Sequence, residues 1–429
     1  MLSNPGRIVT KALAGLNEAG IPLQVQHNVV VPGTLTTVEE SLQLLNKAMA
    51  EANHFSLYYG LNICKYKCRY CRYHSHRVPP DRIEERMNSA IAELSLESIL
   101  FRAQAHNCPR VSSLYIGGGT PALMTETQLD RLLQVCRTSF RITPETEISI
   151  EGTPDALTEA MVCALKKLGI NRISMGIQRL DDDWLARVGR GHNVSDVLRA
   201  LETLVASEVR FNVDLICGFD DQTIEQFLSD LTTVLSYGPH EITVYFLEGR
   251  FQLSGRSLKG VKPADPLTSY LMWEAGRQLC RKHGRQEAPM GWWLKPGVSR
   301  SQVYIDRWLD QVPLVGFGTG AYSFSRYQQY TNLTGKAYRD ALAKATLPID
   351  PSRVFGYSPD QQELHRMAFD LKSVFETQIG TEGTFFEKLE KAGLGKISSG
   401  KFQLNRAGIV VVEEIMRALI EKSAALGQP

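Results

Sequence analysis

Three closely spaced cysteines constrain this chain more than any other feature of its sequence. Cys64, Cys68 and Cys71 are separated by three residues and then by two, and no fourth cysteine follows nearby. One short loop can therefore present three thiolates to a single inorganic cluster. A cubane iron–sulfur cluster holds four irons, so three protein ligands leave one iron free to bind a small chelating molecule. The spacing predicts a [4Fe-4S] site with these three ligands.

A zinc site is the alternative interpretation of the same cysteines. Structural zinc sites close four ligands around one ion, usually as two separated pairs. His74 and His76 follow the cysteines closely, and either could supply the fourth ligand. The compact triplet favours the cluster over zinc.

The composition is that of an ordinary globular protein, with 43% hydrophobic and 22% charged residues. The net charge of +2 gives no overall attraction to nucleic acid or to a membrane. No run of eighteen apolar residues is present, and the first residues lack the apolar segment of a secretory signal. The five other cysteines are scattered singly, as small core residues in a reducing compartment are. We therefore expect a cytoplasmic, monomeric protein that binds neither nucleic acid nor membrane.

Short apolar runs alternate with amphipathic helical stretches from residue 55 to about residue 250. Such alternation predicts a parallel sheet with right-handed crossovers. The six strand candidates are residues 56–60, 112–116, 147–151, 172–178, 210–217 and 241–247. Six such units form a barrel that is open on one side. The predicted fold class is therefore α/β, with a partial (β/α)6 barrel of the TIM-barrel type.

Two smaller regions flank the predicted barrel. Residues 1–50 are expected to form an N-terminal helical extension, and residues 51–345 the barrel with a substrate-side extension. Residues 346–429 are expected to form a small helical domain similar to a winged helix. The charges of that domain are mixed, Glu413 and Glu414 included. We therefore favour a packing or lid role for it over nucleic-acid binding.

Polar residues follow the predicted strands at the edge where chemistry is expected. In parallel β/α folds, sites form at the carboxyl ends of strands, and the cysteine loop directly follows the first strand. Residues 117–119 are glycines after the second strand, which let a ligand approach the backbone and its N–H groups. Glu151 ends the third strand, where a carboxylate can bind an ammonium group or ribose hydroxyls. Asp214 lies within a buried strand and is costly there unless it pairs or binds a ligand. Together with Gln178 and Arg190, these residues predict a site for a polar ligand.

The cysteine triplet, with Tyr70 before its last member, resembles the radical S-adenosylmethionine (SAM) superfamily. Five further stretches narrow the resemblance to the oxygen-independent coproporphyrinogen III oxidase-like family: residues 117–121, 151–154, 176–178, 214–218 and 316–323. The similarity runs from about residue 50 to residue 425. It implies a [4Fe-4S] cluster and two SAM molecules, one on the cluster and one beside it.

The resemblance also implies roles for the residues that match the family pattern. The first SAM molecule would contact Tyr58, Gly118, Glu151 and Tyr322. The second would contact Tyr70, Gly119, Thr120, Gln178, Arg190 and Asp214. The candidates for a catalytic base are Tyr245, Glu248 and His74.

Departures from the family pattern favour one branch. The porphyrinogen oxidases carry a fourth cysteine two residues after the third, where this chain has Tyr73. The heme-chaperone branch carries an Asn-x-x-Tyr-Trp-like motif, and the corresponding residues 301–308 read Ser-Gln-Val-Tyr-Ile-Asp-Arg-Trp. The resemblance is therefore greatest to the class C methyltransferase and cyclopropanase branch. It implies that a deoxyadenosyl radical activates the methyl group of the second SAM for addition to an sp² carbon of a small-molecule substrate.

Two other functions stay open. The first is tetrapyrrole chemistry like that of the porphyrinogen oxidases, in which Arg250, Arg256 and Arg300 could bind propionates. The second is a heme chaperone that keeps the cluster and the SAM site without turnover. Trp292 and Trp293 could stack on a flat ligand. A reducing partner such as flavodoxin or ferredoxin is expected to supply the electron.

Overall fold

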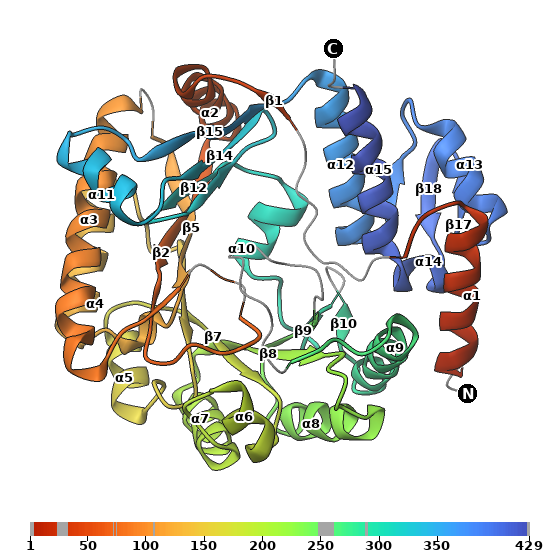
Figure 1. Cartoon of the computed structure of the whole chain (residues 1–429), viewed down its shortest axis with the longest axis horizontal. Helices are drawn as coiled ribbons and strands as arrows, with labels where there is room; N and C mark the ends of the chain where they lie inside the picture. Colours follow the sequence, from red (N-terminus) through yellow and green to blue (C-terminus); the bar gives the residue numbers. More distant parts are fainter. Residues whose placement is uncertain are drawn as a thin grey trace.

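The computed structural model describes residues 4–23, 33–71, 73, 75–105, 108–247, 261–287 and 291–426, with side chains as far as residue 422. Its largest element is a 13-stranded sheet in the order β1-β15-β14-β13-β12-β2-β5-β6-β7-β8-β9-β11-β10. The strands from β12 to β9 run parallel to one another and curve into an open barrel (Figure 1). The predicted α/β partial barrel is therefore confirmed.

All six predicted strands form in this barrel. They are β2 (His54–Leu61), β5 (Arg110–Gly118), β6 (Glu147–Gly152), β7 (Arg172–Gln178), β8 (Arg210–Cys217) and β9 (Glu241–Phe246). A further parallel strand, β12 (Leu314–Phe317), was missed, and it pairs with β2 so that Gly316 lies opposite Tyr58. β12 has only four residues, and its partner strand β2 lies far away in the sequence. No local sequence pattern therefore predicts it.

Shorter strands extend the sheet at both edges. β13 (Tyr322–Phe324), β14 (Gln328–Asn332), β15 (Ile349–Gly356) and β1 (Thr34–Leu35) follow β12, and β11 (Trp292–Leu294) and β10 (Gln286–Glu287) follow β9. The sheet thus includes segments on both sides of the boundaries expected at residues 50 and 345. Those domain boundaries stay predictions.

Helices cover the outside of the barrel (Figure 1). They are α3 (Ile83–Gln104), α4 (Glu126–Ser139), α5 (Glu159–Lys167), α6 (Asp182–Val188), α7 (Val194–Ser207), α8 (Ile224–Ser236) and α9 (Pro266–Lys282). Capping boxes at Thr125, Asn193 and Thr223 satisfy the free N–H groups at the starts of α4, α7 and α8. Apolar strand residues face these helices, and Ile116 and Ile150 are fully buried there.

A second unit lies beside the barrel and contains α12 (Pro359–Val374), α13 (Gly383–Lys391), α14 (Arg406–Val410) and α15 (Val412–Leu426). It also holds a small sheet of β16 (Glu376–Gln378), β18 (Lys401–Leu404) and β17 (Gly395–Ser398). The N-terminal helix α1 (Pro5–Glu18) packs against this unit, where a Cβ on Gly15 would lie 2.8 Å from the Ala392 carbonyl oxygen. The other N-terminal helix, α2 (Val38–Ala52), contacts β14 and β15.

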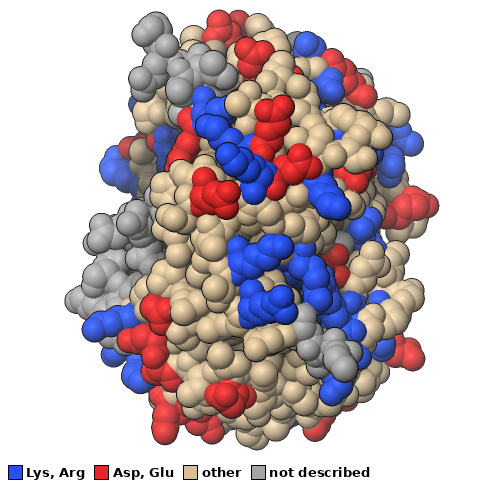
Figure 2. Space-filling model, turned by 90° about the vertical axis from the view of Figure 1, so that its right-hand side faces the viewer, with Lys and Arg blue, Asp and Glu red and all other residues tan. Residues whose placement is uncertain are grey.

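The face that carries α1 and α13 has charges of both signs. Figure 2 shows Lys and Arg side chains gathered near its middle, with Asp and Glu side chains around them. Burial, followed by the nearby charges of Arg277 and Arg406, lowers the pKa of Arg281 on α9. Glu413 and Glu414, two of the mixed charges noted in the sequence, are buried and do not belong to this surface. Within the described ranges, no helix combines the length and the apolar character that a membrane span requires.

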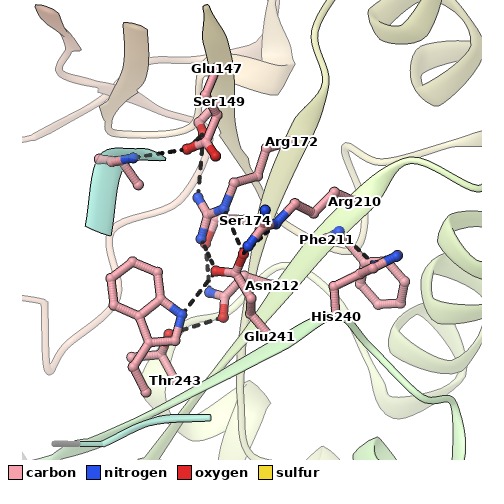
Figure 3. Close-up of polar contacts among 12 residues, drawn as sticks. Glu147, Ser149, Arg172, Ser174, Arg210, Phe211, Asn212, His240, Glu241 and Thr243 are labelled. Carbon is pink, nitrogen blue, oxygen red and sulfur yellow. Dashed lines mark hydrogen bonds and ion pairs between the residues drawn. The ribbon is translucent and has the colours of Figure 1, made fainter. Parts of the chain in front are cut away.

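The inner faces of β6 to β9 carry polar side chains, which form a network under the site (Figure 3). Arg172 donates to Glu241 with an Nη2–Oε2 distance of 2.6 Å, and both side chains are buried. Glu241 also accepts from Arg210 at 2.6 Å and from the indole of Trp292 at 2.9 Å. Removing one partner from such a buried pair typically costs about 3–5 kcal/mol, because it leaves a charge without compensation.

A second group of hydrogen-bonded polar side chains surrounds Asp214. The Asn212 amide donates to Asp214 at 2.7 Å and accepts from the Thr243 hydroxyl at 3.0 Å. Ser174 lies between them, and its hydroxyl accepts from Asn212 at 2.9 Å. The strand register places these side chains side by side, with Ser174 opposite Asn212 and Asp214 opposite Thr243. Two polar groups, one around Glu241 and one around Asp214, therefore lie on the strands beneath the site.

Residues 301–309 form the short helix α10 (Gln302–Tyr304) and the π-helix η3 (Ile305–Leu309), and α10 contacts β5. Asp306 of η3 is buried and accepts hydrogen bonds from the hydroxyls of Ser56, Ser112 and Ser113 at 2.6–2.8 Å. This contact fixes the orientation of η3 relative to β2 and β5. The next residue, Arg307, faces the end of the barrel at which the carboxyl ends of the strands lie.

Candidate functional site

A cavity of about 630 Å³ lies at the carboxyl ends of the barrel strands. It is lined by the fourteen predicted site residues that the structure describes: Tyr58, Cys64, Cys68, Tyr70, Cys71, Gly118, Gly119, Thr120, Glu151, Gln178, Arg190, Asp214, Tyr245 and Tyr322. His74 and Glu248 lie outside the described residues. The structure therefore brings the described residues together, while their individual roles stay predictions.

The cysteine loop begins at β3 (Ile63–Cys64), which pairs with β4 (His76–Arg77). Lys67 closes the loop by donating to the Tyr73 carbonyl oxygen at 3.0 Å and to the Ser75 hydroxyl at 2.8 Å. Burial raises the pKa of Cys64 and of Cys71, which Lys67 opposes. Because burial disfavours the thiolates, a bound metal centre would supply the positive charge that they need.

The arrangement of the sulfurs fits a cluster. All three cysteines are free of disulfides and line the same cavity. Among the described residues, no group of three His, Cys, Asp or Glu side chains is arranged to hold a single metal ion. In a cubane each cysteine binds a different iron, so the three sulfurs need not converge on one point. His76 is exposed and is not among the residues that line the cavity, which weighs against it as a fourth zinc ligand.

The glycine run holds the cysteine loop in place. A Cβ on Gly119 would lie 2.3 Å from the Ile63 carbonyl oxygen, so the close approach of the two segments requires glycine there. The Gly119 N–H donates to Leu61 and the Thr120 N–H donates to Ile63, each at 2.8 Å. The sequence led us to expect that these N–H groups face a ligand. The structure instead uses them within the protein.

Glu151 is a buried carboxylate held by two donors. The Tyr115 hydroxyl donates to it at 2.9 Å and the Gly118 N–H at 3.0 Å. Burial raises the pKa of Glu151 to about 7, and the negative charge of Asp214 acts in the same direction. Tyr115 was missed in the sequence, although strand alternation places it on the same face of β5 as Gly117. The Tyr58 ring stacks on it, with ring centroids 6.2 Å apart.

Asp214 is the second buried carboxylate of the cavity. Burial raises its pKa to about 6, while the hydrogen bond from Asn212 and the charge of Arg172 oppose that effect. Two carboxylates that change protonation near neutral pH therefore face one cavity. Such perturbed groups are a common property of functional sites.

Arg190 ties the cysteine loop to the barrel. Its Nη1 donates to the Tyr70 hydroxyl at 2.9 Å, and its Nη2 donates to the Gly176 carbonyl oxygen. The Tyr70 ring stacks on Trp184 with centroids 5.7 Å apart and meets the edge of Phe219. Arg190 thus has a positioning contact within the protein.

The structure changes the expectations about the residues that were predicted to stack on a flat ligand or to bind propionates. Trp293 is buried in the barrel wall, and Trp292 is engaged with Glu241; neither lines the cavity. Arg250 and Arg256 lie outside the described residues. Arg307 does line the cavity and was missed, because only its position beside the buried Asp306 aims it there.

Comparison with known sequences assigns the central part of the chain. The sequence model of the Radical SAM superfamily matches residues 58–234, from the cysteine loop to α8. This region is therefore similar to the radical SAM domains. The superfamily implies a [4Fe-4S] cluster and SAM as cofactors, and the cysteine loop described above fits that donor set.

Named relatives extend the similarity beyond the radical SAM domain. Heme chaperone HemW of Bacillus subtilis (strain 168) is 27% identical over 383 residues, which are 85% of this chain and 99% of that protein. Heme chaperone HemW of Escherichia coli (strain K12) is 29% identical over 283 residues, 64% of this chain and 71% of that protein. A relative from Mus musculus, Radical S-adenosyl methionine domain-containing protein 1, mitochondrial, is 27% identical over 271 residues, 62% of this chain and 60% of that protein.

A solved structure shows the same fold. Coproporphyrinogen III oxidase (HemN) from Escherichia coli, a radical SAM enzyme, matches with a TM-score of 0.75 at 19% identity. The match covers 88% of this chain and 93% of that structure. The radical SAM barrel and the C-terminal unit are therefore arranged as in HemN-like proteins.

The prediction of methyl or methylene transfer is wrong. It rested on the absence of a fourth cysteine at Tyr73 and of a clear heme motif in residues 301–308, which form α10 and η3. The similarity to the Bacillus subtilis heme chaperone extends over 383 residues instead. The class C branch is not supported, and neither is a natural-product substrate.

The cysteine loop gives the first testable prediction. We expect Cys68→Ser to abolish the brown absorption of the anaerobically reconstituted protein, since wild type should take up about four irons per chain and the variant lacks one ligand. Cys163→Ser, at an exposed cysteine on α5, is the matched control and should keep the full iron content. Iron and sulfide assays measure both. Equal iron in the Cys68 variant and wild type would contradict the assignment of the ligands.

Proposed function

We propose that this chain is a heme-binding protein of the chaperone type. It keeps the cluster and SAM site of the radical SAM domain, binds heme in the adjoining cavity and releases the heme chemically unchanged. The observation that carries the proposal is the similarity to a heme chaperone across 85% of this chain and 99% of that protein. The methyl-transfer alternative has no comparable support.

The shape and the lining of the cavity support a flat ligand. Its volume of about 630 Å³ lies within the usual range of about 300–1,000 Å³ for small-molecule and cofactor sites. Its walls include the rings of Tyr58, Tyr70, Tyr115, Tyr245 and Tyr322. Tyrosine offers an apolar face together with a polar edge, which suits a porphyrin with carboxylate substituents.

The part of the cavity near the cysteine loop suits one SAM molecule. The carboxylate of Glu151 can accept the ammonium group of SAM, and Tyr58 and Gly118 lie beside it. A cluster held by the three cysteines would supply an electron to SAM, which is the chemistry common to the superfamily. The second SAM molecule stays a prediction of the sequence, and in this proposal heme takes the remaining space.

A partner that reduces the cluster belongs to the same proposal. A flavodoxin or ferredoxin would serve, since cluster potentials are low and need a low-potential donor. In this proposal heme is the natural ligand, in place of the small-molecule substrate that the sequence predicted. The monomeric state stays a prediction.

Heme binding tests the proposal. We expect hemin to saturate the folded protein at about one heme per chain, with a shift of the Soret band that free hemin does not show. The control is the same protein unfolded in urea, which should give no saturable shift. Spectrophotometric titration measures both states. A linear rise without saturation, or equal binding by the unfolded chain, would contradict a heme-binding function.

The raised pKa of Glu151 predicts how SAM binding depends on pH. The ionised carboxylate accepts the ammonium group, and its pKa of about 7 means that protons compete with SAM below pH 7. The affinity for SAM should therefore fall by about tenfold from pH 8 to pH 6. The charges of Asp214 and Arg172 also affect the pKa of Glu151, and both residues are unchanged in the Glu151→Gln variant that serves as the control.

The matched variant is Glu151→Gln, which keeps the shape of the side chain and removes its titration. It should bind SAM weakly and with little change between pH 6 and pH 8, as measured by equilibrium dialysis with labelled SAM. Wild-type affinity that is the same at both pH values would show that Glu151 does not bind the ammonium group.

A further inference from the structure

Arg307 is a cavity-lining cation whose position is fixed by the protein. It lies in the π-helix η3 directly after Asp306, whose carboxylate is held by three serine hydroxyls. π-Helical turns are rare and are frequent at functional sites. The guanidinium of Arg307 reaches the cavity on the side of Tyr322.

Aromatic rings surround the Arg307 guanidinium. The ring centroids of Phe324, Trp308, Phe369 and Tyr322 lie 4.7, 5.7, 5.7 and 5.8 Å from its central carbon. These rings hold the cation by cation–π contacts and restrict its rotation. They leave the flat edge of the guanidinium to make hydrogen bonds elsewhere.

One of those hydrogen bonds is missing. The Nη1 of Arg307 is shielded from solvent and has no hydrogen-bond partner, and no ion pair joins Arg307 to a carboxylate of the described residues. The other cations of the cavity have partners: Lys65 lies 3.6 Å from Asp155, and Arg190 donates to Tyr70 through Nη1, although the Arg190 Nε also lacks a partner. Because Arg307 lines the cavity without an ion pair among the described residues, a carboxylate that enters the cavity can pair with its guanidinium.

The guanidinium of Arg307 indicates which kind of acceptor it would bind. Arginine presents parallel N–H groups that match the two oxygens of a carboxylate, and such pairs are among the strongest hydrogen bonds in proteins. The surrounding rings suit a ligand with a flat apolar body next to that carboxylate. Porphyrins such as heme combine both features.

We infer that Arg307 is the carboxylate-binding residue of this cavity and that it holds a propionate of the bound porphyrin. This inference rests on the proposed function and adds a residue and a contact to it.

SAM also carries a carboxylate, so two ligands could supply the partner of Arg307. The guanidinium of Arg307 packs against Tyr322, Phe324 and Trp308. The sequence places Tyr322 beside SAM, so the experiment has to separate the carboxylate of SAM from that of the porphyrin.

The test compares metal-free mesoporphyrin with its dimethyl ester, since the pair differs only in the charged carboxylates and neither needs an axial ligand. Fluorescence titration of the cluster-loaded wild-type protein should show mesoporphyrin binding about tenfold or more tightly than the ester. Arg307→Leu should weaken mesoporphyrin binding about tenfold and leave ester binding unchanged. Arg307→Lys keeps the positive charge but lacks the parallel N–H groups of the guanidinium. Its affinity for mesoporphyrin should therefore lie between that of wild type and that of Arg307→Leu.

Arg300→Leu is the matched control, because this arginine of the same segment packs on Tyr304 and does not line the cavity. It should keep the preference for the free acid. Each variant is checked for cluster content and for SAM affinity, which separates a local effect from misfolding.

Three outcomes overturn the inference in different ways. If Arg307→Leu keeps the full preference for mesoporphyrin, Arg307 does not bind the propionate. If the variant instead loses SAM affinity, its carboxylate partner is that of SAM. If wild type binds neither porphyrin, the proposed function itself fails, and the inference fails with it.

Discussion

The buried pairing of Arg172 and Arg210 with Glu241 is the interaction on which the upper part of the barrel depends. Two cations share one carboxylate, which keeps positive charge beneath the cavity. That charge opposes the effect of burial on Asp214, whose pKa nevertheless rises to about 6. The neutral side chains of Asn212, Ser174 and Thr243 form a separate hydrogen-bonded group around Asp214. The barrel thus has a polar interior that ends in a ligand-sized cavity rather than an apolar core.

The cysteine loop is positioned by contacts that exist without any cofactor. The glycine run packs directly on Ile63, and Arg190 joins Tyr70 to the end of β7. Pre-ordering of this kind lowers the entropy cost of binding a cluster and SAM. On the other side of the cavity, the buried Asp306 fixes η3 and with it the guanidinium of Arg307. The cavity therefore has two separately supported ends, one suited to the cluster and SAM and one suited to a carboxylate-bearing flat ligand.

The sequence predicted the features that have local signals. The six barrel strands are short apolar runs between amphipathic stretches, and the polar residues that follow them meet in one cavity because parallel strands end at one edge. β12, Asp306 and Arg307 could not be predicted, since their positions depend on contacts with strands about 250 residues earlier in the chain. The inward direction of the Gly119 and Thr120 N–H groups also depends on a tertiary contact. The branch of the family was assigned wrongly because two missing short motifs were given more weight than similarity over the whole chain.

The central claim is that this chain binds heme and releases it chemically unchanged. The most direct measurement is the mass spectrum of heme recovered after incubation with the reduced, cluster-loaded protein and SAM. The account predicts that all of the recovered heme has its original mass, including after many times the period needed for binding. Heme that has gained a methyl or methylene group, or has lost a propionate carboxyl group, would show turnover and would contradict the account.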